Sequence, residues 1–366
     1  MTMKAVQLTG HGDMDKLVYR EDVAIPEPGR DEVRIEVHAC GMNNTDVWVR
    51  QGAYGTATDA DAVSTWQSGE PTLEFPRIQG TDIVGSIEAV GRNVSQSRIG
   101  ERVMVDFSIY NRPEGDDSLA DIDYIGHGRD GGYAEYTVVP AANAYSTNAG
   151  ICDAELATFC CSYLTAEHML DRAHVEQDER VLVTGSSGGV GSALIQLCRA
   201  RGAMPFAVTS KSKASEISAI GAEATILRDD AGELVDKVSK AADGQPIDVV
   251  ADLVAGPMFN DLLRVLRPEG RYTTAGAIAG PVVELDLRTM YLNHLQLNGS
   301  SQGTRAAFRR ILKYIEEGRI RPLLSRTFKL SDFHTAQQTF IDKNHVGNLV
   351  IVPDSKWQLF GASHAG

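Results

Sequence analysis

The chain has 366 residues, 43% of them hydrophobic and 23% charged, a composition typical of a globular protein long enough for two domains. Lysine and arginine number 35, whereas aspartate and glutamate number 49, so the formal net charge is −14. This acidic balance argues against general binding to nucleic acid or to an anionic membrane, because both need positive charge. A local basic pocket for a phosphate stays open.

Short runs of branched residues, separated by Gly, Pro and Asp, predict a β-rich first part. In Glu32–Val37 charged and apolar residues alternate, which indicates a half-buried strand. The other predicted strands are Lys4–Leu8, Ile83–Val90, Gly100–Phe107 and Gly132–Val139. Two polar stretches, Ala53–Phe75 and Asn111–Arg129, predict long surface loops, and loops of that length often carry function.

From about Asp153 onward, helices and strands alternate. Asp153 is the predicted N-cap of a helix over Ala154–Ala173. The predicted strands are Arg180–Thr184, Phe206–Thr209, Thr225–Leu227, Ile247–Leu253 and Gly270–Ala275. The predicted helices between them are Val190–Cys198 with its end at Gly202, Ala214–Ile220, Ala231–Ala242 with Asp230 as N-cap, and Met258–Leu266. This alternation with short connections is typical of a doubly wound parallel sheet, so the predicted fold class is α/β.

The last part of the chain predicts two further helices, Arg305–Glu317 and Ser331–Lys343, the second capped by Ser331. A short extended piece at Thr327–Lys329 and a final strand at Leu349–Pro353 accompany them.

The segment Val181–Gly191 is rich in glycine and serine and runs from a predicted strand directly into a predicted helix. Its small residues let the backbone approach a pyrophosphate, and Gly191 allows the helix to pack closely on the strand. The free amides and the dipole of the helix start then face the anion. The residues expected to bind a dinucleotide are Ser187, Gly188, Gly189, Val190 and Gly191. The alternative is a tight strand-to-helix turn without a ligand.

The end of the next predicted strand indicates which dinucleotide binds. An NAD site carries an acid there for the ribose 2′-hydroxyl, but Val208–Lys213 has no acid and two lysines. Hydroxyl and ammonium groups suit a 2′-phosphate, so NADP is the expected cofactor. Its expected ligands are Ser210, Lys211, Lys213 and Arg228. The alternative is a solvated loop after the strand.

The five cysteines are odd in number and lack CxxC spacing, which indicates free thiols in a reducing, cytoplasmic setting. Met1–Val6 lacks a basic region followed by a long apolar run, so no signal peptide is expected. No run of about eighteen apolar residues predicts a membrane span. Neither a membrane nor nucleic acid is therefore an expected partner.

Six stretches together resemble the medium-chain dehydrogenase/reductase superfamily, and more closely its zinc-independent quinone oxidoreductase branch. They are Cys40–Asp46, Gln79–Gly85, Gly131–Tyr136, Thr165–Ala166, Ser187–Gly191 and Gly299–Ser300. The resemblance covers nearly the whole chain. It implies a GroES-like β-barrel catalytic domain made of residues 1–148 and 300–366, with a Rossmann NADP-binding domain of residues 149–299 inserted between them. It also implies a homodimer.

In the zinc alcohol dehydrogenases of this superfamily, a cysteine and a His-Glu pair stand where this chain has Asn43 and Thr81-Asp82. Cys161 is kept at the third ligand position, but catalytic zinc needs about three protein ligands. The region matching the structural zinc lobe, Asp106–Arg129, holds no cysteine. No metal site is therefore predicted, and Cys161 is interpreted as a buried small hydrophobe. A weaker constellation, which we discount, is Asp46, Asp82 and His168.

Without a metal there is no strong Lewis acid to activate an alcohol, so the expected reaction is hydride transfer to an electrophilic quinone or α,β-unsaturated carbonyl. The branch carries an asparagine at Asn43 and a tyrosine at Tyr54, and both are the expected hydrogen-bond donors. Asn43 as a plain turn residue and Tyr54 as a packing residue stay open. Thr165 is expected at the nicotinamide or its phosphates, with a plain helical residue as the alternative, and Gly276 beside the ring.

Three functions therefore stay under consideration. The first is an NADPH-dependent reductase of quinones or enones, and the second is an alcohol dehydrogenase with a metal at Cys161 and Asp82. The third is a dinucleotide-binding sensor or structural protein with little catalysis. The insertion at Thr56–Leu73 leaves the substrate open, and the loop Asp116–Arg129 is longer than the family minimum.

Overall fold

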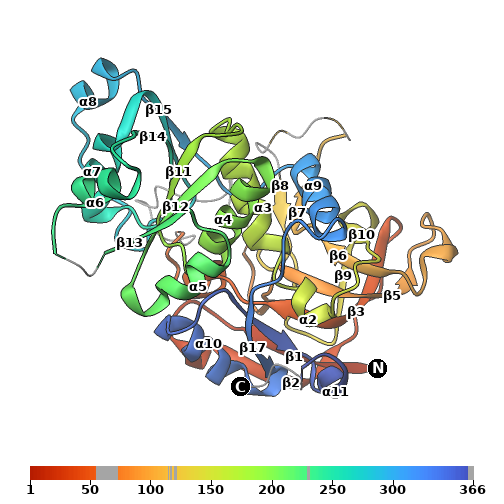
Figure 1. The fold of residues 1–366 in the computed structure, drawn as a ribbon. Coiled ribbons are helices and arrows are strands. Elements are labelled where there is room, and N and C mark those ends of the chain that lie inside the picture. Colours follow the sequence, from red (N-terminus) through yellow and green to blue (C-terminus); the bar gives the residue numbers. More distant parts are fainter. Residues whose placement is uncertain (55–72, 114, 116–117, 119–121, 229–230, 362–366) are drawn as a thin grey trace. The chain divides into compact units, whose positions relative to one another are not determined.

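The computed structural model describes residues 1–54, 73–113, 115, 118, 122–228 and 231–361. The chain divides into two compact units, and Figure 1 shows their elements. Unit 1 comprises Met1–Cys161, Thr304–Phe308 and Pro322–Gly366. Unit 2 comprises Ser162–Gly303 and Arg309–Arg321. The first boundary between the units therefore falls after Cys161. In the C-terminal region, Arg309–Arg321 belongs to unit 2. The insertion expected at Thr56–Leu73 lies almost wholly outside the described residues.

Unit 1 is built mainly from antiparallel strands. Its largest sheet has seven strands in the order β10-β6-β5-β3-β18-β17, with β9 paired to β3 as well. Their bounds are β3 Glu32–Gly41, β5 Asp82–Val90, β6 Arg102–Val105, β9 Tyr136–Pro140, β10 Ala144–Ser146, β17 Leu324–Lys329 and β18 Asn348–Val352. A three-stranded sheet consists of β1 Thr2–Leu8, β2 Leu17–Ala24 and β4 Arg77–Ile78.

The strand β3 shows why this sheet forms. Its residues alternate between buried and half-buried, so Val33, Ile35 and Val37 point into the core as the sequence predicts. In the sheet, β3 lies between β5 and β18. Strand β18 pairs with β3 in antiparallel register, with Val350 opposite Gly41. A strand from the C-terminal end of the chain therefore completes the sheet of the N-terminal part.

One predicted loop contains a strand. Within Asn111–Arg129 the structure has β8, Ile122–Tyr124, which pairs in antiparallel register with β7, Ser108–Tyr110. The prediction of a long surface loop was wrong here, because the side chains of Ile122 and Tyr124 are buried on one face.

Unit 2 is a six-stranded parallel sheet in the order β13-β12-β11-β14-β15-β16. The bounds are β11 Arg180–Val183, β12 Met204–Thr209, β13 Ala224–Leu227, β14 Ile247–Asp252, β15 Leu266–Thr274 and β16 Gln296–Gly299. Numbered from β11, this is the 3-2-1-4-5-6 order of a Rossmann sheet. The predicted α/β fold with a doubly wound parallel sheet is confirmed.

Eleven α-helices occur in the described residues. They are α1 Asn44–Arg50, α2 Asp153–Leu156, α3 Cys160–Arg172, α4 Gly189–Arg201, α5 Ala214–Ala219, α6 Leu234–Ala241, α7 Phe259–Arg264, α8 Leu287–Leu292, α9 Arg305–Glu316, α10 Phe333–Asp342 and α11 Trp357–Phe360. In unit 2, Val238 of α6 and Phe259 and Leu262 of α7 join one apolar cluster with Leu182 and Val250 of the central strands. Figure 1 shows α6 and α7 beside each other.

The predicted helix over Ala154–Ala173 is interrupted. The hydroxyl of Thr158 donates to Glu155 O at 2.7 Å, and the Thr158 N–H donates to the same carbonyl at 3.1 Å. These i→i−3 bonds replace helical ones, so α2 ends at Leu156 and α3 starts anew at Cys160. Asp153 is the first residue of α2, and Cys152 rather than Asp153 is its N-cap.

Two predicted helix starts were also wrong. Helix α6 begins at Leu234 after Glu233, because Gly232 has a φ of 108° that no α-helix accommodates; the predicted cap, Asp230, lies outside the described residues. Helix α10 begins at Phe333 after Asp332. The Ser331 hydroxyl donates to Asp354 Oδ1 at 2.5 Å and does not cap this helix.

All five cysteines carry free thiols, as the sequence predicts. Within the described part of the chain, no helix is both long and apolar enough to cross a membrane.

Candidate active site

The glycine-rich turn joins β11 to α4 in unit 2. Gly188 is the N-cap of α4, and Gly185 has a φ of 57°. A Cβ added at Gly191 would lie 2.2 Å from Gly185 O, so only glycine lets the helix approach the turn this closely. The first amides of a helix have no intrahelical partner, and here they follow a turn whose Gly188 is exposed. The turn therefore has the geometry of an anion site.

The turn is tied to its neighbouring strands. Ser186 Oγ donates to Val208 O of β12 at 2.8 Å. Thr184 donates through its hydroxyl to the carboxylate of Asp252 and accepts from Leu253 N at 2.9 Å. The side chain of Asp252 has no solvent exposure and also accepts from Tyr272 Oη at 2.5 Å. The carboxyl ends of β11, β14 and β15 are therefore fixed by one buried carboxylate.

Basic residues gather where β12 and β13 end. Ser210 precedes the short 3₁₀ helix Lys211–Lys213, and Arg228 N donates to Thr209 O at 3.0 Å. Partial burial and, next, the charge of Arg228 lower the pKa of Lys213. The structure therefore brings Lys213 and Arg228 within electrostatic reach of each other.

Thr209, which the sequence analysis did not single out, lies at the same place. Its hydroxyl is buried and has no hydrogen-bond partner among the described residues. A buried hydroxyl without a partner is costly, and a ligand group can satisfy it. Together with the cations and the close backbone of the turn, this orphaned hydroxyl fits a phosphorylated nucleotide.

Two further expected nucleotide residues lie in unit 2. Thr165 is on α3 and is 9% exposed. Gly276 follows β15, and a Cβ added there would lie 3.1 Å from Leu253 O. The same segment is held by the Ala279 N–H, which donates to Val254 O at 2.8 Å. A larger residue at Gly276 would therefore crowd the backbone after β14.

Unit 1 holds a buried polar cluster around Asn43. Asn43 N donates to Asp46 Oδ2 at 2.8 Å as part of a capping box at the start of α1. Its amide Nδ2 lies 3.1 Å from Asp82 Oδ2 and 3.3 Å from Thr81 Oγ1. Tyr133 Oη donates to Asp46 Oδ2 at 2.6 Å. The amide hydrogens of Asn43 are therefore directed at protein acceptors.

The two carboxyl groups of this cluster have unusual proton affinities. Burial raises the pKa of Asp82 to about 7, and the hydrogen bonds from Asn43 and the Cys161 N–H offset part of that rise. Burial likewise raises the pKa of Asp46 to about 6, against hydrogen bonds from Tyr133 and two backbone amides. The charge of Asp46 adds to the rise in the pKa of Asp82, and the cluster holds protons close to neutral pH.

Tyr54 lies in the turn after α1 and is half-buried. Its ring meets Trp48 edge-on, with ring centroids 5.8 Å apart. Burial raises the pKa of Tyr54, and the charges of Cys161 and Asp46 add to the rise. Tyr54 therefore keeps its proton over the physiological range and shares its neighbourhood with the Asn43 cluster.

The residues at the family's metal-ligand positions do not fit a zinc ion. They supply one amide, one hydroxyl, one carboxyl and one thiol. The two oxygens of Asp82 are engaged by Asn43 Nδ2 and by the Cys161 N–H. Zinc needs about three imidazole, thiolate or carboxylate ligands, which this set lacks. Among the described residues, no three His, Cys, Asp or Glu side chains come together as metal ligands.

One detail of that region, the exposure of Cys161, differs from expectation. Cys161 is partly exposed and not buried. His168 lies in unit 2, where its Nδ1 faces the backbone carbonyls of Ser301 and Gln302.

Two family descriptions match the chain. "Alcohol dehydrogenase GroES-like domain" matches residues 29–149, and "Zinc-binding dehydrogenase" matches residues 189–317. The first falls in the β-rich N-terminal part and the second in the parallel-sheet region and beyond.

A solved structure, a putative alcohol dehydrogenase from Sinorhizobium meliloti 1021, is 65% identical, with a TM-score of 0.92 over 96% of this chain and 97% of that one. Among curated relatives, an NAD-dependent alcohol dehydrogenase of Sulfurisphaera tokodaii is 27% identical over 96% of this chain and 100% of its own length. An acryloyl-coenzyme A reductase of the same organism is 28% identical over the same shares. A human quinone oxidoreductase is 26% identical over 93% of this chain and 94% of its own.

Proposed function

The chain belongs to the medium-chain dehydrogenase/reductase superfamily, and from that premise we propose that it is an NADPH-dependent reductase of a quinone or an α,β-unsaturated carbonyl compound. Its relatives show that it is an oxidoreductase of this superfamily. We propose further that residues 1–148 and 300–366 carry the substrate chemistry and residues 149–299 bind the nucleotide.

One observation supports NADPH over NADH. The end of β12 carries Thr209, Ser210 and two lysines, with Arg228 beside them and no acid. A 2′-phosphate offers charge to the cations and an acceptor to the hydroxyls, whereas a ribose 2′-hydroxyl seeks a carboxylate there. Relatives whose names specify NAD exist, so the cofactor is the part of the proposal that a titration decides first.

The residues of unit 2 have separate tasks in this proposal. The amides of Ser187–Gly191 hold the pyrophosphate, and Gly191 allows the close approach of backbone that this needs. Thr165 and Gly276 border the nicotinamide half. The bound nucleotide supplies the hydride, and the protein supplies orientation and the exclusion of water.

The acceptor class follows from the polar cluster of unit 1. Its donor set suits no zinc ion, so an acceptor that is already electrophilic is favoured over an unactivated alcohol. Reduction adds one hydride and one proton to the acceptor. Tyr54 is the proposed donor to the developing oxyanion or enolate, and its raised pKa keeps the hydroxyl protonated. Relatives named quinone oxidoreductase and acryloyl-coenzyme A reductase are named for acceptors of this kind.

Asn43 takes a role that differs from direct donation. Because its amide hydrogens are directed at Thr81 and Asp82, it positions the cluster next to the substrate donor.

Alcohol oxidation is the second candidate, favoured by the names of several relatives, including the one that is 65% identical. A dinucleotide-binding protein with little catalysis is the third. The experiment that separates them is acceptor-dependent oxidation of NADPH with a small quinone and a small enone, run with and without a chelator. Turnover that survives the chelator supports the reductase. Alcohol-dependent turnover that the chelator abolishes, or tight binding without turnover, overturns it.

We also propose that unit 2 forms a homodimer. Strand β16 is the outermost strand of its sheet. The stretch before it exposes large apolar side chains that are each more than half accessible, namely Ile278, Val282, Leu287, Tyr291 and Leu292. An open sheet edge beside apolar side chains suits self-association. Sedimentation of the wild type as a dimer and of the Val282→Asp variant as a monomer is expected, whereas a monomeric wild type contradicts the proposal.

We also propose a cytoplasmic location. Five free thiols in one chain suit a reducing, cytoplasmic setting.

A further inference from the structure

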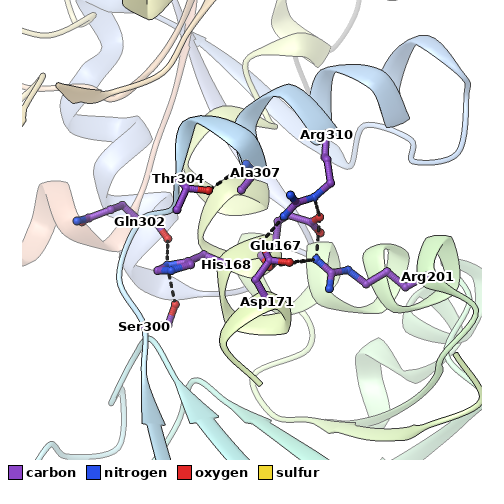
Figure 2. A network of polar contacts seen from close by, with 9 residues as sticks. All are labelled: Glu167, His168, Asp171, Arg201, Ser300, Gln302, Thr304, Ala307 and Arg310. Carbon is purple, nitrogen blue, oxygen red and sulfur yellow. Dashed lines mark hydrogen bonds and ion pairs between the residues drawn. The ribbon is translucent and has the colours of Figure 1, made fainter. Parts of the chain in front are cut away.

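His168 on α3 holds the segment that follows β16. Its Nδ1 lies 3.0 Å from Gln302 O, 3.2 Å from Ser301 O and 3.3 Å from Ser300 Oγ, as Figure 2 shows for Gln302 and Ser300. Backbone carbonyls only accept hydrogen bonds, so Nδ1 carries the proton. Burial lowers the pKa of His168, which keeps the ring neutral with that single proton on Nδ1.

The segment Ser300–Gly303 has an unusual backbone conformation. Gln302 has a φ of 34°, a left-handed conformation that non-glycine residues rarely adopt, and its side chain is buried. A Cβ added at Gly303 would lie 2.6 Å from Leu164 Cδ1 and 2.9 Å from Leu164 O. The segment is therefore pressed against α3 at Leu164 and His168, and its shape depends on that helix.

Two acids of α3 pair with arginines of other helices. Glu167 has no exposed side-chain surface and lies 2.8 Å from Arg201 Nη2 and from Arg310 Nε. Asp171, one turn later, pairs with Arg201 at 2.7 Å and also with Arg310. In Figure 2 both guanidinium groups point toward these two acids from α4 and α9. Helix α3 therefore does not shift easily, and His168 presents its proton from a fixed place.

The position of this segment gives it a function. Ligands of a doubly wound sheet bind at the carboxyl ends of the strands, and the two halves of a dinucleotide occupy the two halves of the sheet. The proposed 2′-phosphate pocket lies at β12 and β13, so β14–β16 belong to the nicotinamide half. Thr165, expected at the nicotinamide, precedes His168 by three residues and so lies on the same face of α3.

We propose that His168 is a positioning residue for the nicotinamide half of NADPH, because its Nδ1–H fixes Ser300–Gly303 against α3, the helix that also carries Thr165. The inference rests on the proposed nucleotide function. Under this proposal, the binding affinity for the adenosine half does not depend on His168.

The test compares two variants and two ligands in the full-length protein. His168→Asn places an amide N–H where Nδ1–H was, whereas His168→Leu keeps bulk without a donor. The ligands are NADPH and adenosine 2′,5′-bisphosphate, which carries the adenosine half alone. We expect His168→Leu to weaken NADPH binding by about tenfold, the equivalent of one lost hydrogen bond, with the bisphosphate affected less than about twofold. His168→Asn is expected to restore most of the NADPH affinity.

A control outside α3 separates positioning from stability. Val238→Ala opens a small cavity in an apolar cluster that contains no residue of α3, and it is expected to leave the ratio of the two affinities unchanged. If His168→Leu loses affinity for both ligands equally, or loses no affinity for NADPH, the inference is overturned while the nucleotide site stands. A wild type that binds neither ligand overturns the nucleotide site and the inference together.

Discussion

Asn43 Nδ2 lies 3.1 Å from Asp82 Oδ2, and Asp82 has no solvent exposure. This pairing makes Asn43 one of two donors to a buried carboxyl group, beside the Cys161 N–H, with Thr81 as the second acceptor of the same amide. Removal of the amide leaves a buried carboxyl with one donor fewer. The polar cluster of unit 1 therefore depends on Asn43 for its stability as well as for its shape.

The Asn43→Ala variant is expected to lose about 1–3 kcal/mol of unfolding free energy, the cost of an unsatisfied buried polar group. In an Asp82→Asn background the same change is expected to cost less, since the buried carboxyl is gone. A double-mutant cycle by chemical denaturation measures the difference. Equal costs in both backgrounds would show that the Asn43–Asp82 contact carries no coupling.

Tyr54→Phe keeps the ring against Trp48 and removes only the hydroxyl. We expect kcat for quinone or enone reduction to fall by roughly 10²-fold, the lower range for loss of a positioned proton donor. The KM for NADPH is expected to stay unchanged. Steady-state kinetics with both acceptors check this, and an unaltered kcat would leave Tyr54 as a packing residue.

Replacing cations at the end of β12 and β13 tests the 2′-phosphate pocket. Lys213→Ala and Arg228→Ala are each expected to weaken NADPH by about tenfold and to leave NADH unchanged, because charge-assisted hydrogen bonds are worth about 1.5–3 kcal/mol. Lys240→Ala, on the exposed side of α6, is the matched control. Equal effects on both nucleotides would exclude a 2′-phosphate contact.

Two glycines of the turn are expected to respond differently to alanine. At Gly191 a Cβ meets Gly185 O at 2.2 Å, so Gly191→Ala is expected to cost about 3 kcal/mol through overpacking. At Gly188 the nearest atom is 3.6 Å away, so Gly188→Ala is expected to cost only about 1 kcal/mol as a poorer helix cap. Thermal denaturation ranks the two variants, and the reverse order would contradict the described turn.

The buried carboxyl of Asp82 makes stability depend on pH. Burial raises its pKa from the ordinary 3.8 to about 7 in the folded protein, so the folded state binds the proton more tightly. That contribution is fully present below pH 3.8 and is lost as pH rises toward 7. Asp82→Asn is therefore expected to gain stability relative to the wild type across this range, by up to about 1.4 kcal/mol per pH unit. Parallel profiles of the two proteins would contradict the raised pKa.

Much of the fold was predictable because its signals are local. The alternation in Glu32–Val37 and the glycine turn at Val181–Gly191 each specify an element and its buried face without reference to distant residues. The expected helix end at Gly202 also stands, since this residue adopts the left-handed conformation there.

The errors arose where distant or competing contacts decide. Ser331 gives its hydroxyl to Asp354, 23 residues away, and a helix pattern does not show such a partner. Thr158 interrupts a helical run because its hydroxyl donates to the backbone carbonyl of Glu155, three residues earlier.

For the candidate site, the sequence indicates residue types, whereas the contacts between them come from the structure. Asn43 was expected as a donor to the substrate, yet its amide faces Asp82, a residue 39 positions later. Asp252 is the last residue of β14, at the ligand edge of the sheet, a position that signals function. Its link to Thr184 and Tyr272 emerges only when three strands lie side by side.

The most direct test of the proposed function is a paired calorimetric titration of the purified protein with NADPH and NADH at one ionic strength. The proposal predicts that NADPH binds at least about tenfold more tightly, since the 2′-phosphate adds charge-assisted hydrogen bonds. It also predicts that the difference shrinks as salt is raised. Tighter binding of NADH, or equal binding of the two, would contradict the assignment of Lys213 and Arg228 to a phosphate and favour an NAD-dependent enzyme.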